Sequence, residues 1–478
     1  MSDAASLREQ ARRRALIVIL TGLAAAAVYV LLPVGVNELA RRAAAIFVVA
    51  CVFWATEALP TYATALCVVA LEVLFLAHNG GVAGALPSRS AWPVGPDGAP
   101  VRLTVDAFFA PLGSPIIVLF LGGLLLAAAV VKHGLDRALA VRLLSPVAGH
   151  PLRLMISLAC GTALLSMWMS NTAATAMMLS IITPLLPRGP TSRYGTGLAM
   201  CVALGANLGG MTTPISTPPN AIATGALRAA GHEVRFFDWV VVSLPLAAVL
   251  VVGAAVLLYA MFPPLPGEKI DTGSFAAARH ERLTWPAKAT LAVLVAAMAL
   301  WVTEPLHGLS PAAVALLAAA ALTALGLLGR EDLDHLDWNI LILMWGGLSL
   351  GQAMQSTGLL AHVGALPIAH LGGFSQAAVI ALLTVSLGTF MSNTATANLM
   401  VPVAMGLAPE RAAELAVVTA YACSFGVALP VSTPSNAMVF ASGRVPLRDM
   451  IKAGLVMQFV ALGLLLLGYR QAIAWLLR

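Results

Sequence analysis

The stretch "MSNTAATAMM" (residues 169–178) returns later in the chain as "MSNTATANLM" (residues 391–400), and these two copies decide the fold. Each copy places the triplet Ser-Asn-Thr in the middle of a long apolar segment. Ser, Asn and Thr are favoured at helix N-termini, because their side-chain oxygens accept hydrogen bonds from free backbone N–H groups. Each triplet therefore predicts a break in the apolar segment, followed by a helix that begins near Thr172 or Thr394.

The composition predicts a protein that lies in a lipid bilayer. Of the 478 residues 60% are hydrophobic and only 10% are charged, and the mean hydropathy is +0.90. A water-soluble protein would carry roughly a quarter charged residues, so that class is excluded. The net charge of +6 needs no nucleic-acid partner, because basic residues mark the cytoplasmic loops of membrane proteins. The fold class is therefore an all-α polytopic membrane protein.

The apolar pattern predicts about eleven transmembrane helices, each long enough to cross a bilayer, and two re-entrant hairpins, at 152–187 and 374–403. The expected helices cover residues 15–33, 42–57, 60–77, 107–131, 195–226 with a break near 213–219, 238–262, 288–304, 310–328, 338–357, 411–441 with a break near 430–435, and 449–476. The expected divisions are an N-terminal cytoplasmic segment with the first helix (1–41), a first repeat (42–262), a cytoplasmic linker (263–287) and a second repeat (288–478).

The basic residues predict the orientation of the two repeats. If the N-terminus is cytoplasmic and both triplets form re-entrant hairpins, most of the 27 basic residues fall on the cytoplasmic side, with Arg41 and Arg42 as exceptions. An odd number of spans then separates the hairpins, so the second repeat is inverted relative to the first. Inverted repeats with interrupted helices near the midplane are the architecture of many secondary transporters.

Two further motifs occur in both repeats and in the same order. "GGLLLAAAVVKHGL" (122–135) matches "GGLSLGQAMQSTGL" (346–359), and "PISTPPNA" (214–221) matches "PVSTPSNA" (430–437). The prolines of the second pair interrupt a helix and free nearby carbonyls, which together with Ser, Thr and Asn oxygens suit a small cation. The capped helix N-termini suit an anion. Neither the triplets nor the proline breaks contain a charged residue, so dipoles, hydroxyls and co-bound cations would neutralise that anion.

These motifs, with "FWATEALP" (53–60) and "SFGVALPVSTPSNAMV" (424–439), resemble the divalent anion/sodium symporter family over nearly the whole chain. The resemblance implies a homodimer in the cell inner membrane, an elevator-type movement of a transport domain, and no organic cofactor. It also implies sodium as the coupling ion. The substrates of that family are C4-dicarboxylates such as succinate, malate or fumarate, citrate and, in some branches, sulfate.

The resemblance also assigns site residues by position. The substrate carboxylates would contact Asn171, Thr172, Asn393 and Thr394, with Thr217, Pro218, Thr433 and Pro434 lining the same pocket. The first sodium site would consist of Ser166, Ser170, Asn171 and Ser216, and the second of Gly388, Asn393 and Ser432. Gly388 has no side-chain oxygen where the first repeat has Ser166, so the number of sodium ions stays open.

Three alternatives follow from the same residues. The protein could be a sodium-independent dicarboxylate exchanger, or a carrier of sulfate or another inorganic anion with the same architecture. A membrane enzyme with Ser170 as nucleophile needs a base within reach, and no His or Lys lies near either triplet in the sequence. The duplication also argues against an enzyme, because a hydrolase needs one triad and not two equal half-sites.

Two sets of residues remain outside these motifs. Glu57 and Glu304 follow a threonine near matching helix ends and are interpreted as interfacial or helix-pairing residues. Four tryptophans near span ends are interpreted as anchors at the membrane interface; they are Trp54, Trp239, Trp285 and Trp338.

Overall fold

The computed structural model describes residues 2–33, 35–79, 103–147, 149–183, 192–265 and 283–476, and these residues form helices and connecting segments without a β-strand. The first half contains α1 (Ser2–Leu31), α2 (Glu38–Thr56), α3 (Thr61–Leu76), α4 (Val105–Phe109), α5 (Pro115–Lys132), α6 (Leu135–Leu144), α7 (Pro151–Ser166), α8 (Asn171–Ile182), α9 (Arg193–Gly209), α10 (Pro218–Ala229) and α11 (Phe236–Met261). The second half contains α13 (Trp285–Val302), α14 (Glu304–His307), α15 (Pro311–Ala324), α16 (Arg330–Asp334), α17 (Trp338–Ser356), α18 (Leu359–Val363), α19 (Gly373–Phe390), α20 (Asn393–Leu407), α21 (Ala412–Cys423), α22 (Pro434–Ala441) and α23 (Leu447–Leu476). Most of the expected linker lies outside the described residues.

The helices confirm a polytopic membrane protein. Within the described residues, seven helical segments are long and apolar enough to cross a bilayer: Arg12–Leu31, Glu38–Thr56, Val105–Lys132, Phe236–Met261, Trp285–Val302, Gly373–Phe390 and Leu447–Arg470. Four shorter apolar helices accompany them: Thr61–Leu76, Pro151–Ser166, Asn171–Ile182 and Pro311–Ala324. The segments expected at 195–226 and 411–441 are each divided into two shorter helices, α9 with α10 and α21 with α22, which confirms the breaks predicted near 213–219 and 430–435.

Proline chemistry explains where these two segments divide. α10 and α22 each begin at a proline, which fixes φ and lacks an N–H group, and both prolines follow a threonine in extended conformation. Thr217 has φ −145° and ψ 139°, and Thr433 has φ −145° and ψ 150°. The residues that join α9 to α10 (210–217) and α21 to α22 (424–433) are called break 1 and break 2 below.

The two Ser-Asn-Thr triplets lie at the tips of helical hairpins, α7–α8 and α19–α20. The hydroxyl of Ser170 accepts a hydrogen bond from the N–H of Ala173 (3.2 Å), and Ser392 does the same for Ala395 (3.3 Å). The predicted N-caps are therefore present, although the helices begin at the asparagine of each triplet. α20 continues to Leu407, beyond the expected end at 403, and residues 184–187 of the first hairpin lie outside the described residues.

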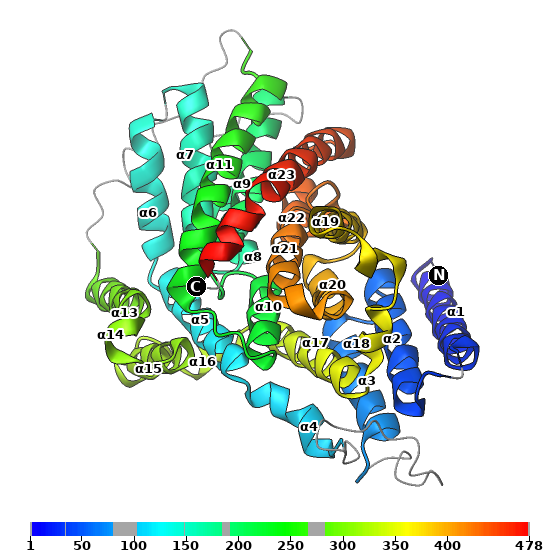
Figure 1. Cartoon of the computed structure of the whole chain (residues 1–478). Helices are drawn as coiled ribbons and strands as arrows, with labels where there is room; N and C mark the ends of the chain where they lie inside the picture. The colour runs from blue at the N-terminus through cyan, green and yellow to red at the C-terminus, as the bar shows by residue number, and fades with distance from the viewer. Residues whose placement is uncertain are drawn as a thin grey trace.

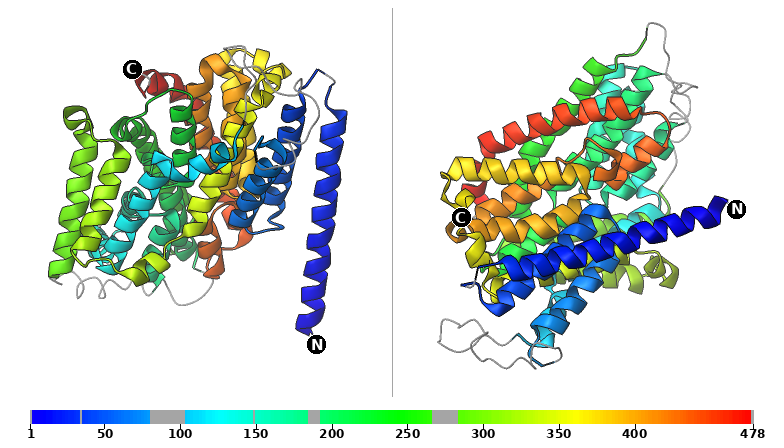
Figure 2. Two further views of the ribbon diagram at one scale, coloured as in Figure 1. Left: turned by 90° about the horizontal axis from the view of Figure 1, so that it is seen from below. Right: turned by 90° about the vertical axis from the view of Figure 1, so that its right-hand side faces the viewer.

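The elements of the two halves follow each other in the same order. In each half a helix pair is followed by a long helix, a short helix, a hairpin, a broken helix and a final long helix. The helix pairs α2–α3 and α13–α15 lie toward opposite ends of the molecule, and the hairpins and broken helices lie between them (Figure 1). Figure 2 shows α1 along one edge, beyond α2 and α3, with α13 and α15 at the opposite edge.

Glycines allow the hairpins to approach the broken helices closely. A Cβ atom on Gly209 of α9 would lie 2.4 Å from the Ala163 Cα of α7. In the second half, a Cβ on Gly426 would lie 2.6 Å from the Gly388 carbonyl oxygen of α19. Because real Cβ atoms do not come this close, only glycine permits this packing, which brings each hairpin tip onto a break.

The interpretation of the four tryptophans is wrong for two of them. Trp285 and Trp338 are exposed, as an interface anchor should be, but Trp54 and Trp239 are 1% and 0% exposed. Trp239 donates its indole N–H to the Met211 carbonyl in break 1 (3.1 Å). This residue therefore supports the break from inside the protein.

Candidate functional site

The first hairpin tip contacts break 1 through Asn171. Ser166 Oγ donates to Asn171 Oδ1 (2.7 Å) and also lies 2.8 Å from the Ala206 carbonyl of α9. A Cβ on Gly210 would lie 2.2 Å from Asn171 Oδ1, so the amide rests directly against the glycine backbone at the start of the break. Two members of the predicted first sodium site, Ser166 and Asn171, are therefore in contact.

Ser216, the third member, lies inside break 1 and bonds to its backbone. Ser216 Oγ lies within hydrogen-bond distance of the Gly210 and Thr213 carbonyls and can donate its one hydrogen to either, and Asn220 Nδ2 donates to both oxygens (3.0 and 2.9 Å). The sequence predicts that the break frees its carbonyls, but these two accept hydrogen bonds from side chains of the same motif. A buried carbonyl without a donor is costly, and this explains why an asparagine follows the two prolines.

At the second hairpin tip an asparagine again lies against glycine backbone, but its amide oxygen has no hydrogen-bond donor among the described residues. Asn393 lies beside Gly426 and Gly388: a Cβ atom on these residues would lie 3.0 and 3.2 Å from Asn393 Oδ1. This oxygen is buried and has no hydrogen-bond donor among the described residues. Ser432 Oγ donates to the Thr389 carbonyl (2.7 Å), so it holds break 2 to the first arm of the hairpin.

The two halves of the site meet at Asn207, a residue of α9 that is 1% exposed. Asn171 Nδ2 donates to Asn207 Oδ1 (3.4 Å), and Asn207 Nδ2 donates to Thr433 Oγ1 (3.2 Å) and Asn436 Oδ1 (3.1 Å). A chain of side chains thus joins the tip of the first hairpin to break 2. The structure brings together two predicted substrate residues, Asn171 and Thr433, from opposite halves.

The predicted residues differ in exposure. Thr172 and Pro434 are exposed; Asn171, Asn393 and Thr394 are partly buried; Thr217, Thr433, Ser216 and Ser432 are buried. Among the described contacts, the side chains of Thr172, Thr217 and Thr394 make no hydrogen bond. Ser170 is occupied as the cap of α8. The tips therefore present accessible polar groups above a buried hydrogen-bonded layer.

Three asparagines of this layer were not assigned as site residues from the sequence. Asn220 and Asn436 are the next-to-last residues of the matched motifs "PISTPPNA" and "PVSTPSNA", whose Ser, Thr and Asn oxygens were expected to suit a cation, and this repetition was the signal that could have identified them individually. Asn207 gave no such signal, because the corresponding residue of the second half is Cys423.

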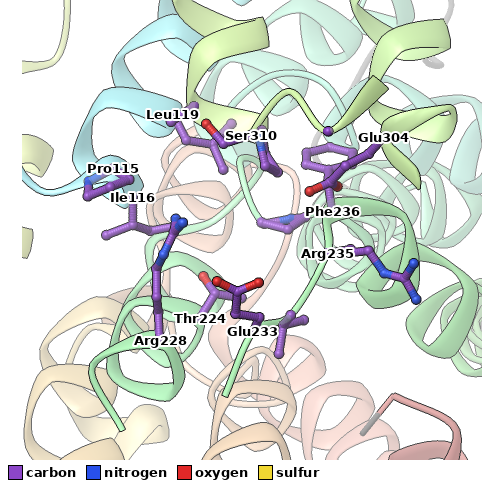
Figure 3. Close-up of a pocket in the computed structure, with 15 residues that line it drawn as sticks. Pro115, Ile116, Leu119, Thr224, Arg228, Glu233, Arg235, Phe236, Glu304 and Ser310 are labelled. Atoms are coloured by element: carbon purple, nitrogen blue, oxygen red, sulfur yellow. The ribbon is translucent and has the colours of Figure 1, made fainter. Parts of the chain in front are cut away.

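A cavity of about 250 Å³ lies beside break 1, between α5, α10, the start of α11 and the α14–α15 connection (Figure 3). Figure 3 shows Arg228, Glu233 and Glu304 around it, with Arg235 directed away. Arg235 pairs with Asp238 (2.7 Å). Pro214 of break 1 lines the cavity, but none of the site residues predicted from the sequence does.

The described part of the chain contains no group of three or more His, Cys, Asp or Glu side chains that could hold a metal ion. The oxygens gathered at the tips and breaks belong to amides, hydroxyls and backbone carbonyls. Neutral oxygens of this kind suit a hard cation better than a soft transition metal.

A helical membrane protein with two capped hairpin tips against two broken helices has the architecture of a secondary transporter. The chain belongs to the citrate transporter family (CitMHS), whose profile matches residues 51–422 and 298–477.

Several relatives are named for transport. The sodium-dependent high-affinity dicarboxylate transporter 3 of Caenorhabditis elegans is 30% identical over 75% of this chain and 74% of its own length. The sodium-dependent dicarboxylate transporter SdcS of Staphylococcus saprophyticus is 27% identical over 84% of this chain and 80% of its own. The Alcanivorax borkumensis YdaH transporter, at 15% identity, shares the fold with a TM-score of 0.56 and covers 86% of this chain and 98% of its own.

The resemblance to divalent anion/sodium symporters is thereby confirmed. The chain is a multi-pass membrane transporter and not an enzyme.

Proposed function

We propose that this protein imports a C4-dicarboxylate such as succinate, malate or fumarate, coupled to sodium, in a cell inner membrane with its N-terminus in the cytoplasm. One observation carries the proposal: the neutral hydrogen-bonded layer that joins Asn171 of one hairpin tip to Thr433 of the opposite break. Two relatives named as sodium-dependent dicarboxylate transporters support the substrate class.

The substrate's two carboxylates would lie at the N-termini of the four helices that begin at the tips and breaks, α8, α10, α20 and α22. Helix N-termini carry free N–H groups and the positive end of the helix dipole, which stabilise an anion without a fixed countercharge. The proposed contacts are those assigned above from the sequence: Asn171, Thr172, Thr217, Pro218, Asn393, Thr394, Thr433 and Pro434.

Sodium would bind on the other side of the same asparagines. A buried amide oxygen without a donor costs free energy, and a cation compensates that cost. Asn393 Oδ1 is such an oxygen, which supports a sodium ion at the second site although Gly388 contributes no side chain. The first site would use Ser166, Ser170, Asn171 and Ser216. Because the ion and the anion attract each other, each would bind more tightly in the presence of the other.

Alternating access would proceed by an elevator-type movement of the hairpins and broken helices against the remaining helices. α17 packs along α20 and α10, whereas α5 packs along α10 without comparable packing on the first hairpin. The two halves therefore have matching elements that pack differently. In an alternating-access transporter, exchanging these two arrangements closes the binding site on one side of the membrane and opens it on the other. A homodimer would hold the fixed helices in place.

Uptake into liposomes tests this function. The purified protein is reconstituted, and radiolabelled succinate uptake is measured with an inward sodium gradient, without sodium, and with unlabelled succinate inside. Protein-free liposomes are the control. We expect uptake that requires external sodium. Uptake that ignores sodium but rises with internal succinate would identify a dicarboxylate exchanger, and competition by sulfate instead of malate or fumarate would identify an inorganic anion carrier.

A further inference from the structure

The orientation of three asparagine side chains is fixed by two backbone carbonyls. Asn436 Nδ2 donates to the carbonyls of Val427 (2.7 Å) and Leu429 (3.1 Å), which can only accept. The Asn436 oxygen must therefore face Asn207, so the Asn207 amide nitrogen faces Asn436 (3.1 Å). The Asn207 oxygen consequently faces Asn171 and accepts from its nitrogen.

This orientation decides what Thr433 can offer a ligand. A hydroxyl has one donor and two acceptor positions. Thr433 Oγ1 accepts from Asn207 Nδ2 (3.2 Å) and from the backbone N–H of Asn436 (3.1 Å), so both acceptor positions are used. The described contacts leave its O–H without an acceptor, and the hydroxyl can therefore act toward a ligand only as a donor.

The hydrogen bonds of Asn171 also fix the orientation of its amide group. Its oxygen accepts from Ser166 Oγ, and one hydrogen of its nitrogen is directed to Asn207. The second hydrogen of the Asn171 amide remains available. Asn207 therefore turns two neighbours from opposite halves, Asn171 and Thr433, into hydrogen-bond donors, which is the polarity that a carboxylate requires.

The second half of the chain has no asparagine at the position that corresponds to Asn207. Matching "STPPN" with "STPSN" places Cys423 opposite Asn207, and a thiol cannot replace a carboxamide as donor and acceptor. The amide oxygen of Asn393 in this other half-site has no donor among the described residues, and neither has that of Asn220 after break 1. One half-site thus presents organised donors, and the other presents the free amide oxygen of Asn393 as an acceptor.

We propose that Asn207 is the positioning residue that makes the Asn171–Thr433 half-site specific for a carboxylate, whereas the Asn393 half-site favours a cation. This inference rests on the proposed anion transport and names the residue that gives the two half-sites different chemistry. Asn207 is buried behind both partners and acts through them without touching the substrate.

Asn207→Cys is the test variant, because the fold already accepts a cysteine at the matching position 423. In sodium-driven succinate uptake we expect the KM for succinate to rise about tenfold, since one hydrogen bond to a charged group becomes poorly aligned. The sodium concentration for half-maximal uptake, measured at saturating succinate, should change less than twofold. Cys201→Ala, on the same helix and equally buried, should leave both values unchanged.

A double-mutant cycle shows whether Asn207 acts through Thr433. Thr433→Val removes the hydroxyl and keeps the shape of the side chain. If Asn207 works by aligning that hydroxyl, Asn207→Cys should raise the KM much less in the Thr433→Val background than in the wild type. Independent effects, or an unchanged KM in folded Asn207→Cys, would overturn the inference. If the wild type itself transports no divalent anion, the proposed function fails instead.

Discussion

Trp54 and Trp301 make the same hydrogen bond in the two halves of the chain. Each indole N–H donates to a backbone carbonyl at the start of the following helix, that of Thr61 or Pro311, and both distances are 3.1 Å. Both side chains are 1% exposed. The two helix pairs therefore have the same internal joint, although they lie toward opposite ends of the molecule (Figure 1).

The glutamates that follow these joints behave differently. Glu57 is exposed and has a positive φ of 49°. Glu304 is partly buried on the cavity that Phe236 also lines at the start of α11, and its Oε2 has no hydrogen-bond donor among the described residues. The Phe236 ring stacks on Trp301, with centroids 4.4 Å apart, and Trp168 beside the first hairpin tip joins the stack. Figure 3 shows Glu304 and Phe236 side by side. Only one of the two matching carboxylates, that of Glu304, is thus partly buried in this conformation.

The burial of the Glu304 carboxyl predicts that the stability of the folded protein depends on pH. Burial raises the pKa of Glu304, against the lowering effects of Arg235, the Phe236 N–H and His307 and together with the raising effect of Asp238. A raised pKa means that the folded protein, with Glu304 in this position, favours the protonated carboxylic acid. The stabilisation should be complete below the ordinary carboxyl pKa of about 4.3 and should be lost as the pH rises through the raised value.

Thermal unfolding in detergent, followed by tryptophan fluorescence at several pH values, measures this effect. Glu304→Gln stays neutral and should remove this part of the pH dependence, whereas Glu57→Gln should leave it intact. A pH profile identical for wild type and Glu304→Gln would contradict the prediction.

Asn171→Ala and Asn393→Ala should each impair transport severely and leave membrane insertion intact. Each change removes a hydrogen bond to a buried charged group, worth about 1.5–3 kcal/mol, which corresponds to a loss of about tenfold to a hundredfold in uptake efficiency. Initial uptake rates over a range of succinate concentrations check this. Normal transport by both variants would mean that the tips are helix caps and nothing more.

Ser166→Ala should raise the sodium concentration needed for half-maximal uptake. Ser166 Oγ is a proposed sodium ligand and also donates to Asn171 Oδ1, so its loss removes one ligand and loosens another. The measurement is uptake at fixed succinate over a series of sodium concentrations, with choline as the replacing cation. An unchanged sodium dependence would exclude Ser166 from the first site.

Gly210→Ala tests the close contact between the first hairpin and break 1. The new Cβ would lie 2.2 Å from Asn171 Oδ1, so the amide must move, at a cost of about 1–3 kcal/mol. We expect transport to be lost in a protein that still folds. Gly253→Ala in α11 is the matched control, because a Cβ there meets nothing within 4 Å. Equal activity of the two variants would show that the contact is not needed.

Cysteine labelling tests the inverted orientation. In a variant without native cysteines, Gly149→Cys at the base of the first hairpin should react with an impermeant thiol reagent from the cytoplasmic side only. Gly372→Cys at the base of the second should react from the external side only. Both positions have open space around them, so the added side chain should not disturb the fold. Labelling from one common side would refute inversion.

The membrane class, the hairpin tips and the breaks could all be predicted from the amino-acid sequence. These features depend on local physics: apolar length for the spans, hydroxyl caps at Ser170 and Ser392, and prolines at 218 and 434. Each can be recognised without knowing what lies across the protein.

Which side chains meet could not be predicted from the sequence and follows from the packing of the folded chain. The tryptophan pattern suggested the same interfacial role for Trp54 and Trp285, yet packing buries the first and exposes the second. Asn207 lies in an apolar helix with nothing in the sequence to mark it, and its role depends on partners from both halves. A hydrogen bond needs two groups at a fixed distance and direction, and for residues more than 200 positions apart only the folded chain supplies them.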